Sequence, residues 1–139
     1  MISNLVVQKF GGTSLANIER IQAVADLIEQ SVQDGKEVVA VVSAMAGETQ
    51  RLIDLAKEVQ SEPDPREYDA LISSGEQVSV ALLAMALKEK NFLSKSYTAF
   101  QVGLKTDQIH GKARINSIDT SICLLYTSPT PRDTPISRM

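Results

Sequence analysis

The sequence is short of cysteine, positive charge and long apolar runs. One cysteine, Cys123, occurs in 139 residues, so no internal disulfide can form and nothing points to an oxidising compartment. The formal net charge of −3 argues against a nucleic-acid partner, because surfaces that bind nucleic acid concentrate positive charge. No apolar run approaches the roughly 18 residues of a membrane-spanning helix, and no basic and apolar leader opens the chain. We therefore expect a soluble, cytoplasmic chain with no membrane partner.

The first apolar stretch of the chain has the residue order of a strand, a tight turn and a helix start. It ends in Lys9, and the glycines Gly11 and Gly12 are followed by Thr13 and Ser14. Paired glycines can adopt positive φ and bring backbone N–H groups close to a ligand, while either hydroxyl can cap the helix. Such a helix start attracts phosphate, and the lysine would add a full charge. The alternative is an ordinary turn with a solvated lysine.

Two apolar strands flank a helix in the first third of the chain. Apolar residues recur at steps of three and four from Leu15 to Val32, which predicts an amphipathic helix that stops at Asp34-Gly35. The run Val38–Val42 is almost wholly β-branched, as in a strand that is buried on both faces of a parallel sheet. These elements predict a right-handed β-α-β unit and an α/β fold.

A small, polar segment follows the second strand, at the edge where α/β sheets present ligand-binding loops. Its hydroxyl residues Ser43 and Thr49 can donate to a carboxylate, and a helix that begins near Thr49 adds further donors. Alternatively, Ser43 only ends the strand and Thr49 only caps the helix. That helix should extend to about Gln60, and its inward-facing residues should be Leu52, Ile53, Leu55, Ala56 and Val59.

Another polar segment, Ser73–Gln77, precedes an apolar run. The run from Val78 to Lys88 is apolar nearly all round, which predicts a buried helix. Glu76 stands at the expected start of this helix. It either interacts with the helix dipole or awaits the ammonium group of a ligand.

The remaining segments carry weaker signals. Two prolines in Ser61–Arg66 predict a solvent-facing connection. Ser96–Phe100 has strand composition, and a loop that contains His110 follows. We assign His110 no proton-transfer role, because a single loop histidine with no fixed partner is more often solvated.

Three of these motifs, in this order, resemble the amino-acid kinase family, and its aspartate kinase branch in particular. The motifs are Lys9–Ser14, Val41–Met45 with Gly47 and Thr49, and Ser73–Glu76. The resemblance spans residues 4–120. It implies a three-layer αβα sandwich with a mainly parallel sheet, in truncated form.

The resemblance also implies an activity, which is transfer of the γ-phosphoryl group of ATP, with Mg²⁺, to the β-carboxylate of L-aspartate. Lys9 would be catalytic and would help to bind ATP. Full-length members of the branch are expected to form homo-oligomers. The implied ATP-binding residues are Lys9, Gly11, Gly12, Thr13 and Ser14, and the implied substrate-binding residues are Ser43, Ala44, Thr49 and Glu76.

The resemblance ends near Thr120. We therefore divide the chain into residues 1–120, the N-terminal part of a catalytic domain, and residues 121–139, a non-native-looking or disordered tail that contains Pro129, Pro131 and Pro135. Three alternatives remain open. The chain could come from a sister kinase that acts on acetylglutamate, glutamate or a nucleoside monophosphate, it could be a non-catalytic nucleotide-binding module, or it could be a fragment with no function.

Overall fold

The computed structural model describes residues 4–121 and has the expected α/β element order. Strands β1 and β2 are parallel and pair in register from Leu5 opposite Glu37 to Phe10 opposite Val42, which confirms the β-α-β unit. The strands are β1 (Leu5–Phe10), β2 (Glu37–Val42), β3 (Leu104–Thr106) and β4 (Ile115–Ile118), and the helices are the 3₁₀ turn η1 (Gly12–Leu15), α1 (Ile18–Gln33), α2 (Glu48–Val59) and α3 (Pro65–Glu89).

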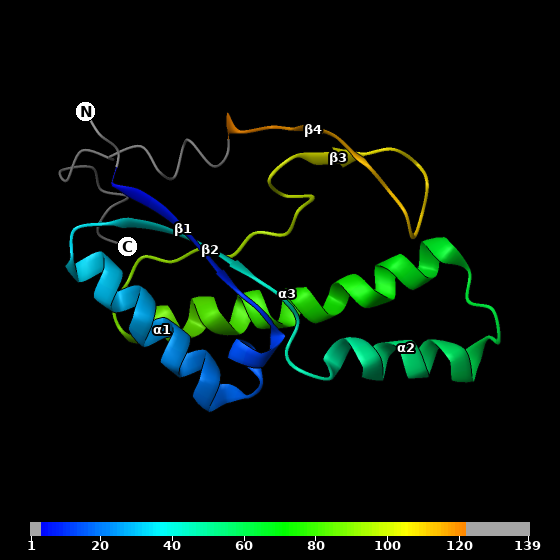
Figure 1. Cartoon of the computed structure of the whole chain (residues 1–139), viewed down its shortest axis with the longest axis horizontal. Helices are drawn as coiled ribbons and strands as arrows, with labels where there is room; N and C mark the ends of the chain where they lie inside the picture. Colours follow the sequence, from blue (N-terminus) through cyan, green and yellow to red (C-terminus); the bar gives the residue numbers. More distant parts are fainter. Residues whose placement is uncertain (1–3, 122–139) are drawn as a thin grey trace.

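Helices α1 and α3 lie on one side of the β1–β2 sheet, and the antiparallel β3–β4 pair lies on the other side (Figure 1). The core forms where α1, α3 and the inner face of the sheet meet, with Val38, Ala40 and Val42 of β2 packed against it. Burial of these apolar side chains holds the helices on the sheet. The buried members of the core are Leu15, Ile21, Val24, Ala25, Ile28, Leu83 and Leu87.

The outer face of the sheet is open in residues 4–121. Val7 of β1 is 66% exposed and Val41 of β2 is 46% exposed, so the expectation that the second strand is buried on both faces is wrong for this part of the chain. The reason is that α1 and α3 cover only the inner face. Because parallel sheets are normally covered on both faces, the open face fits an αβα sandwich that is truncated.

Helix α1 is capped by a residue that the sequence analysis did not single out. The Asn17 side chain accepts a hydrogen bond of 2.9 Å from the Arg20 N–H, so the expectation that Thr13 or Ser14 caps this helix is wrong. Both hydroxyl residues belong to η1, which inserts a 3₁₀ turn between the glycines and α1. The predicted stop is confirmed, since Asp34 is the C-cap of α1 and the next residue, Gly35, has a φ of +80°.

Helix α3 is one continuous helix of 25 residues, capped by Asp64 with Pro65 in its first turn. The expected helix start near Val78 is therefore wrong. The helix is also not buried all round, since Met85 is 62% exposed. By length and composition α3 could cross a membrane, but one such helix is weak evidence, because the core helix of a soluble protein passes the same test.

Two further expectations differ from the structure. Ser96–Phe100 is irregular, and the strand lies later, at Leu104–Thr106; strand composition is realised only where a partner strand is present. On α2, Val59 is 90% exposed and Leu55 is 41% exposed, because the helix contacts α3 through the face that carries its buried residues Leu52 and Ala56. The tail expected to be non-native or disordered lies, from Ile122 onward, outside the described residues.

Candidate functional site

Three parts of the chain meet at Ala44, which is 4% exposed. They are the turn that contains Gly11 and Gly12 (the glycine turn), the end of β2 and the middle of α3. A Cβ atom on Gly12 would lie 3.1 Å from the Ala44 carbonyl oxygen, and a Cβ atom on Gly75 would lie 3.1 Å from the Ala44 Cβ. Either contact is tighter than side chains normally make. The three motifs, which are far apart in the sequence, are thus packed against one residue, and each glycine is needed for that approach.

The backbone conformation of the glycine turn differs from the expectation. Gly11 has a φ of −80°, and Gly12 is not among the glycines with positive φ, so the expectation that these residues adopt positive φ is wrong. Gly12 is needed because the turn lies directly against Ala44. A Cβ atom on Gly11 would meet nothing within 4 Å, so the space beside its Cα is open to a ligand.

The backbone of Ser43 is fully hydrogen-bonded. Its N–H donates to the Phe10 carbonyl at 3.2 Å, which extends the pairing of β1 and β2 by one residue. Its carbonyl accepts a hydrogen bond of 2.6 Å from the Ser79 hydroxyl of α3. The hydroxyl group is therefore the hydrogen-bond donor that Ser43 has left for a ligand.

The first turn of α2 has no side-chain cap, and Gly47 precedes it with a φ of +78°. Thr49 is exposed and does not cap the helix, so the alternative that it serves only as a cap is wrong. Glu48 accepts hydrogen bonds from Arg51 at 2.9 and 2.7 Å, and these bonds hold the pKa of the Glu48 carboxyl below its usual range. Because Arg51 balances this charge, the uncapped donors of the turn stay available to an anion.

Lys9 and Glu76 both have unpaired charges in residues 4–121, where neither forms an ion pair. Lys9 is exposed on the outer face of the sheet, in alternation with the exposed Leu5 and Val7. Glu76 is exposed in the middle of α3. The alternative that Glu76 interacts with the positive end of its helix is therefore wrong, because that effect is confined to the first turn.

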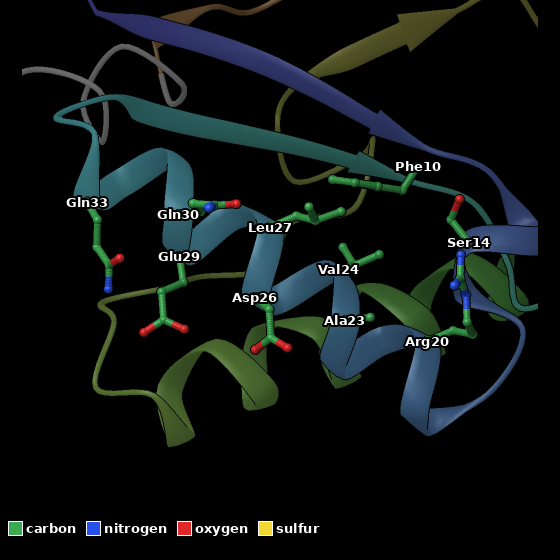
Figure 2. A pocket seen from close by; sticks show the side chains of 10 residues that line it. All are labelled: Phe10, Ser14, Arg20, Ala23, Val24, Asp26, Leu27, Glu29, Gln30 and Gln33. Carbon is green, nitrogen blue, oxygen red and sulfur yellow. The ribbon is translucent and has the colours of Figure 1, made fainter.

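A shallow groove of about 740 Å³ lies along α1, away from Ala44. Figure 2 shows its side chains along α1, with Phe10 above Val24 and Leu27 and with Ser14 near Arg20 at one end. Ser14 is the one predicted site residue that lines it, and Thr13 is exposed on the turn. The groove therefore does not bring the predicted site residues together. Its lining residues are Phe10, Ser14, Arg20, Ala23, Val24, Asp26, Leu27, Glu29, Gln30 and Gln33.

His110 has a fixed partner, contrary to the expectation. Its Nδ1 atom lies 3.3 Å from an Asp69 carboxylate oxygen, which also accepts a 2.8 Å hydrogen bond from the Gly111 N–H. These contacts attach the loop between β3 and β4 to the start of α3. Within residues 4–121, no group of three histidine, cysteine, aspartate or glutamate side chains could hold a metal ion.

The chain is similar to aspartokinases. It is 53% identical over 117 residues to an aspartokinase of Geobacillus stearothermophilus, an alignment that covers 84% of this chain and 29% of that protein. It is 50% identical over 118 residues to aspartokinase 2 of Bacillus subtilis, covering 85% of this chain and 29% of that protein. The chain thus spans less than a third of the length of these curated relatives.

Solved structures show the same likeness. The aspartate kinase of Synechocystis matches with a TM-score of 0.61 and 54% identity, over 63% of this chain and 15% of that one. The aspartokinase III of E. coli, solved with aspartate and ADP, matches with a TM-score of 0.69 over 81% of this chain and 35% of that one; at 23% identity it supports the fold alone. The model of the amino acid kinase family matches residues 4–126, and the chain belongs to that family.

Proposed function

We propose that this chain is the N-terminal part of an aspartate kinase, which moves the γ-phosphoryl group of ATP to the β-carboxylate of L-aspartate. The observation that carries the proposal is the convergence of the three motifs on Ala44, which Gly12 and Gly75 each approach more closely than side chains normally allow. Similarity to aspartokinases at 50 to 53% identity supports the choice of substrate.

The reaction needs positioning and charge balance more than proton transfer. A β-carboxylate oxygen attacks the γ-phosphorus, a P–O bond forms, and the bond to the β-phosphate oxygen breaks, releasing ADP. Because the carboxylate is already ionised at pH 7, no general base is required. Catalysis then depends on holding two anions in line and stabilising the charge on the transferred group.

The glycine turn and Lys9 are suited to the phosphates. Lys9 supplies a cation that no carboxylate in residues 4–121 neutralises. Gly11 leaves open space for a close approach, and no side chain caps η1. Thr13 and Ser14 follow in the same turn and complete the proposed ATP-binding set. Mg²⁺ would neutralise phosphate charge, and we propose that it arrives with ATP, since the described residues offer no metal cluster.

The substrate side of the proposal uses the other two motifs. Glu76 takes the ammonium group of aspartate, and the hydroxyls of Ser43 and Thr49 donate to its carboxylates. Ala44, which both Gly12 and Gly75 approach closely, would lie beside the substrate with its backbone. The uncapped start of α2 adds favourable donors for a carboxylate.

A chimera tests the proposal, because the chain spans only part of its relatives. In it, residues 4–120 replace the matched segment of the Geobacillus stearothermophilus aspartokinase. We expect it to form aspartyl hydroxamate with ATP and hydroxylamine, and to discriminate against glutamate and acetylglutamate. Circular dichroism and size-exclusion chromatography report whether it folds. A folded chimera without aspartate-dependent turnover would contradict the proposed function.

Glu76→Gln in this chimera should raise the KM for aspartate at least tenfold and change the KM for ATP by less than twofold. The reason is that a hydrogen bond to a charged group contributes about 1.5–3 kcal/mol, and the amide removes the charge that pairs with the substrate ammonium. Initial rates at varied aspartate measure the effect. Glu89→Gln, an exposed change at the end of the same helix, is the control, and an unchanged KM for aspartate in Glu76→Gln would remove Glu76 from the site.

The 139-residue chain by itself should be inactive in the same assay. It spans less than a third of its relatives, and the open sheet face, where Val7 is 66% exposed, exposes apolar surface that favours aggregation. The purified chain is assayed for ATP-dependent aspartyl hydroxamate beside a blank without aspartate. Soluble chain with turnover above the blank would overturn this expectation.

The domain division stays part of the proposal. We propose that residues 1–120 belong to the catalytic domain and that residues 121–139 do not continue it; the family match ends at residue 126. Sequencing the genomic DNA beyond the codon for Thr120 tests the division, because an open frame that continues into other α/β sequence would identify the tail as foreign. A cytoplasmic location and a homo-oligomeric full-length enzyme complete the proposal.

A further inference from the structure

One side of α3 carries a regular row of buried residues that changes in size along the helix. Gly75, Ser79, Leu83 and Leu87 recur at steps of four and are its buried members. The two leucines pack into the core with α1, whereas the two small residues face the end of β2. The small residues let the helix approach the backbone after β2, and of the two only Ser79 can form a side-chain hydrogen bond there.

Ser79 is 0% exposed, and it is the one buried polar residue in the part of the chain that the structure describes. Its hydroxyl lies 2.6 Å from the Ser43 carbonyl oxygen and 3.1 Å from the Glu76 carbonyl oxygen of its own helix. A hydroxyl has one proton to donate, and the shorter distance favours the bond to Ser43. A buried carbonyl that lost this partner would be costly, so the bond fixes α3 against the end of β2.

This bond lies between two groups that must keep a fixed separation. Ser43 and Ala44 stand on one side of it, and Glu76, one helical turn before Ser79, stands on the other. Figure 1 shows α3 passing beneath the end of β2 at this place. A shift of α3 relative to β2 would move the glutamate away from the hydroxyl of Ser43, whereas Lys9 lies on strand β1.

We propose that Ser79 is a positioning residue, which sets the distance between the Ser43–Ala44 segment and Glu76 and so determines the affinity for the amino-acid substrate. The inference rests on the proposed function, because it assumes that both groups bind aspartate. Ser79 itself does not contact the substrate, since its hydroxyl is buried against backbone. Its effect should therefore appear in the KM for aspartate and leave the KM for ATP nearly unchanged.

Ser79→Ala in the chimera tests the inference. We expect the KM for aspartate to rise five- to tenfold and the KM for ATP to stay within twofold. Ser94→Ala is the matched control, because the Ser94 hydroxyl also donates to a carbonyl of α3, that of Ala84, at 2.8 Å but far along the helix from Glu76. If Ser79 had only a structural role, Ser79→Ala and Ser94→Ala would both have a lower melting temperature. In each variant the KM for aspartate and the KM for ATP would then change by the same factor.

A second pair of variants separates the hydroxyl from the volume of the side chain. Ser79→Thr and Ser79→Val add the same volume, but only threonine keeps the hydroxyl. We expect the threonine variant to have a KM for aspartate at least threefold lower than the valine variant. Equal KM values in this pair, or a wild-type KM in Ser79→Ala, would overturn the inference while the activity of the unmutated chimera still supports the proposed function. Failure of the unmutated chimera would instead contradict the function itself.

Discussion

Lys9→Ala should lower kcat of the chimera by about 10²–10³, the loss that follows removal of one preorganised donor from a developing negative charge. The KM for aspartate should change less than threefold, because Lys9 is assigned to the phosphates. Folding should not change, since the side chain is exposed and forms no ion pair within residues 4–121. Steady-state rates at saturating ATP and aspartate measure the effect.

Lys36→Ala is the control for this change. Lys36 is also an exposed lysine, and it lies just before β2, at the opposite end of the sheet from the glycine turn. Its loss should leave kcat within twofold, so that a general effect of removing positive charge can be recognised. A fall of less than about tenfold in Lys9→Ala, equivalent to about 1.4 kcal/mol, would contradict the phosphate role of Lys9.

The sequence alone was sufficient to predict the helices and strands whose pattern depends on neighbouring residues. The strand that ends before the glycines, the helix with apolar residues at steps of three and four, and its stop at Asp34-Gly35 each depend on neighbouring residues, and all three are confirmed. Where the pattern depends on distant partners, the predictions were less successful. Ser96–Phe100 has the composition of a strand but no partner strand among the described residues. Val41 belongs to a run with the composition of a buried strand, but no layer covers its face of the sheet within residues 4–121.

The roles of the residues around the site were harder to predict, because they depend on contacts between segments that are far apart in the sequence. Gly12 and Gly75 were each interpreted as local features, one as a flexible turn and the other as a helix boundary. Both are instead points of close contact with Ala44, and α3 runs through Gly75 without a break. The four-residue spacing of Gly75, Ser79, Leu83 and Leu87 was visible in the sequence and would have predicted one continuous helix with one buried row.

The role of Ser79 was also not predictable from the local sequence. A serine in the middle of an apolar helix is usually satisfied by the carbonyl three or four residues earlier, and the Glu76 carbonyl oxygen does lie 3.1 Å from the Ser79 hydroxyl. The shorter bond to Ser43 joins residues 36 positions apart and leaves no trace in the local pattern. Only the packing of α3 under the end of β2 reveals that this hydroxyl connects the second motif, through Ser43, to the helix that carries the third.

The other large effect is expected for Gly12→Val in the chimera. Its Cβ atom would lie 3.1 Å from the Ala44 carbonyl oxygen, and the two added methyl groups need further space beside Ala44, whose side chain is already close to Gly75. We expect a loss of about 1–3 kcal/mol in stability from overpacking. A displacement of about 1 Å between the glycine turn and the Ser43–Ala44 segment can lower turnover by about 10²-fold. Thermal melting and kcat/KM measure the two effects.

Gly11→Ala tests whether a methyl group in the glycine turn obstructs ATP without disturbing the packing of the protein. A Cβ atom on Gly11 meets nothing within 4 Å and the residue has a φ of −80°, so the melting temperature should not change. If the phosphates of ATP approach this open side, however, the methyl group stands in their way and the KM for ATP should rise at least fivefold. An unchanged melting temperature and kcat/KM in Gly12→Val would contradict the packing argument. An unchanged KM for ATP in Gly11→Ala would move the phosphates away from this turn, whatever the result at Gly12.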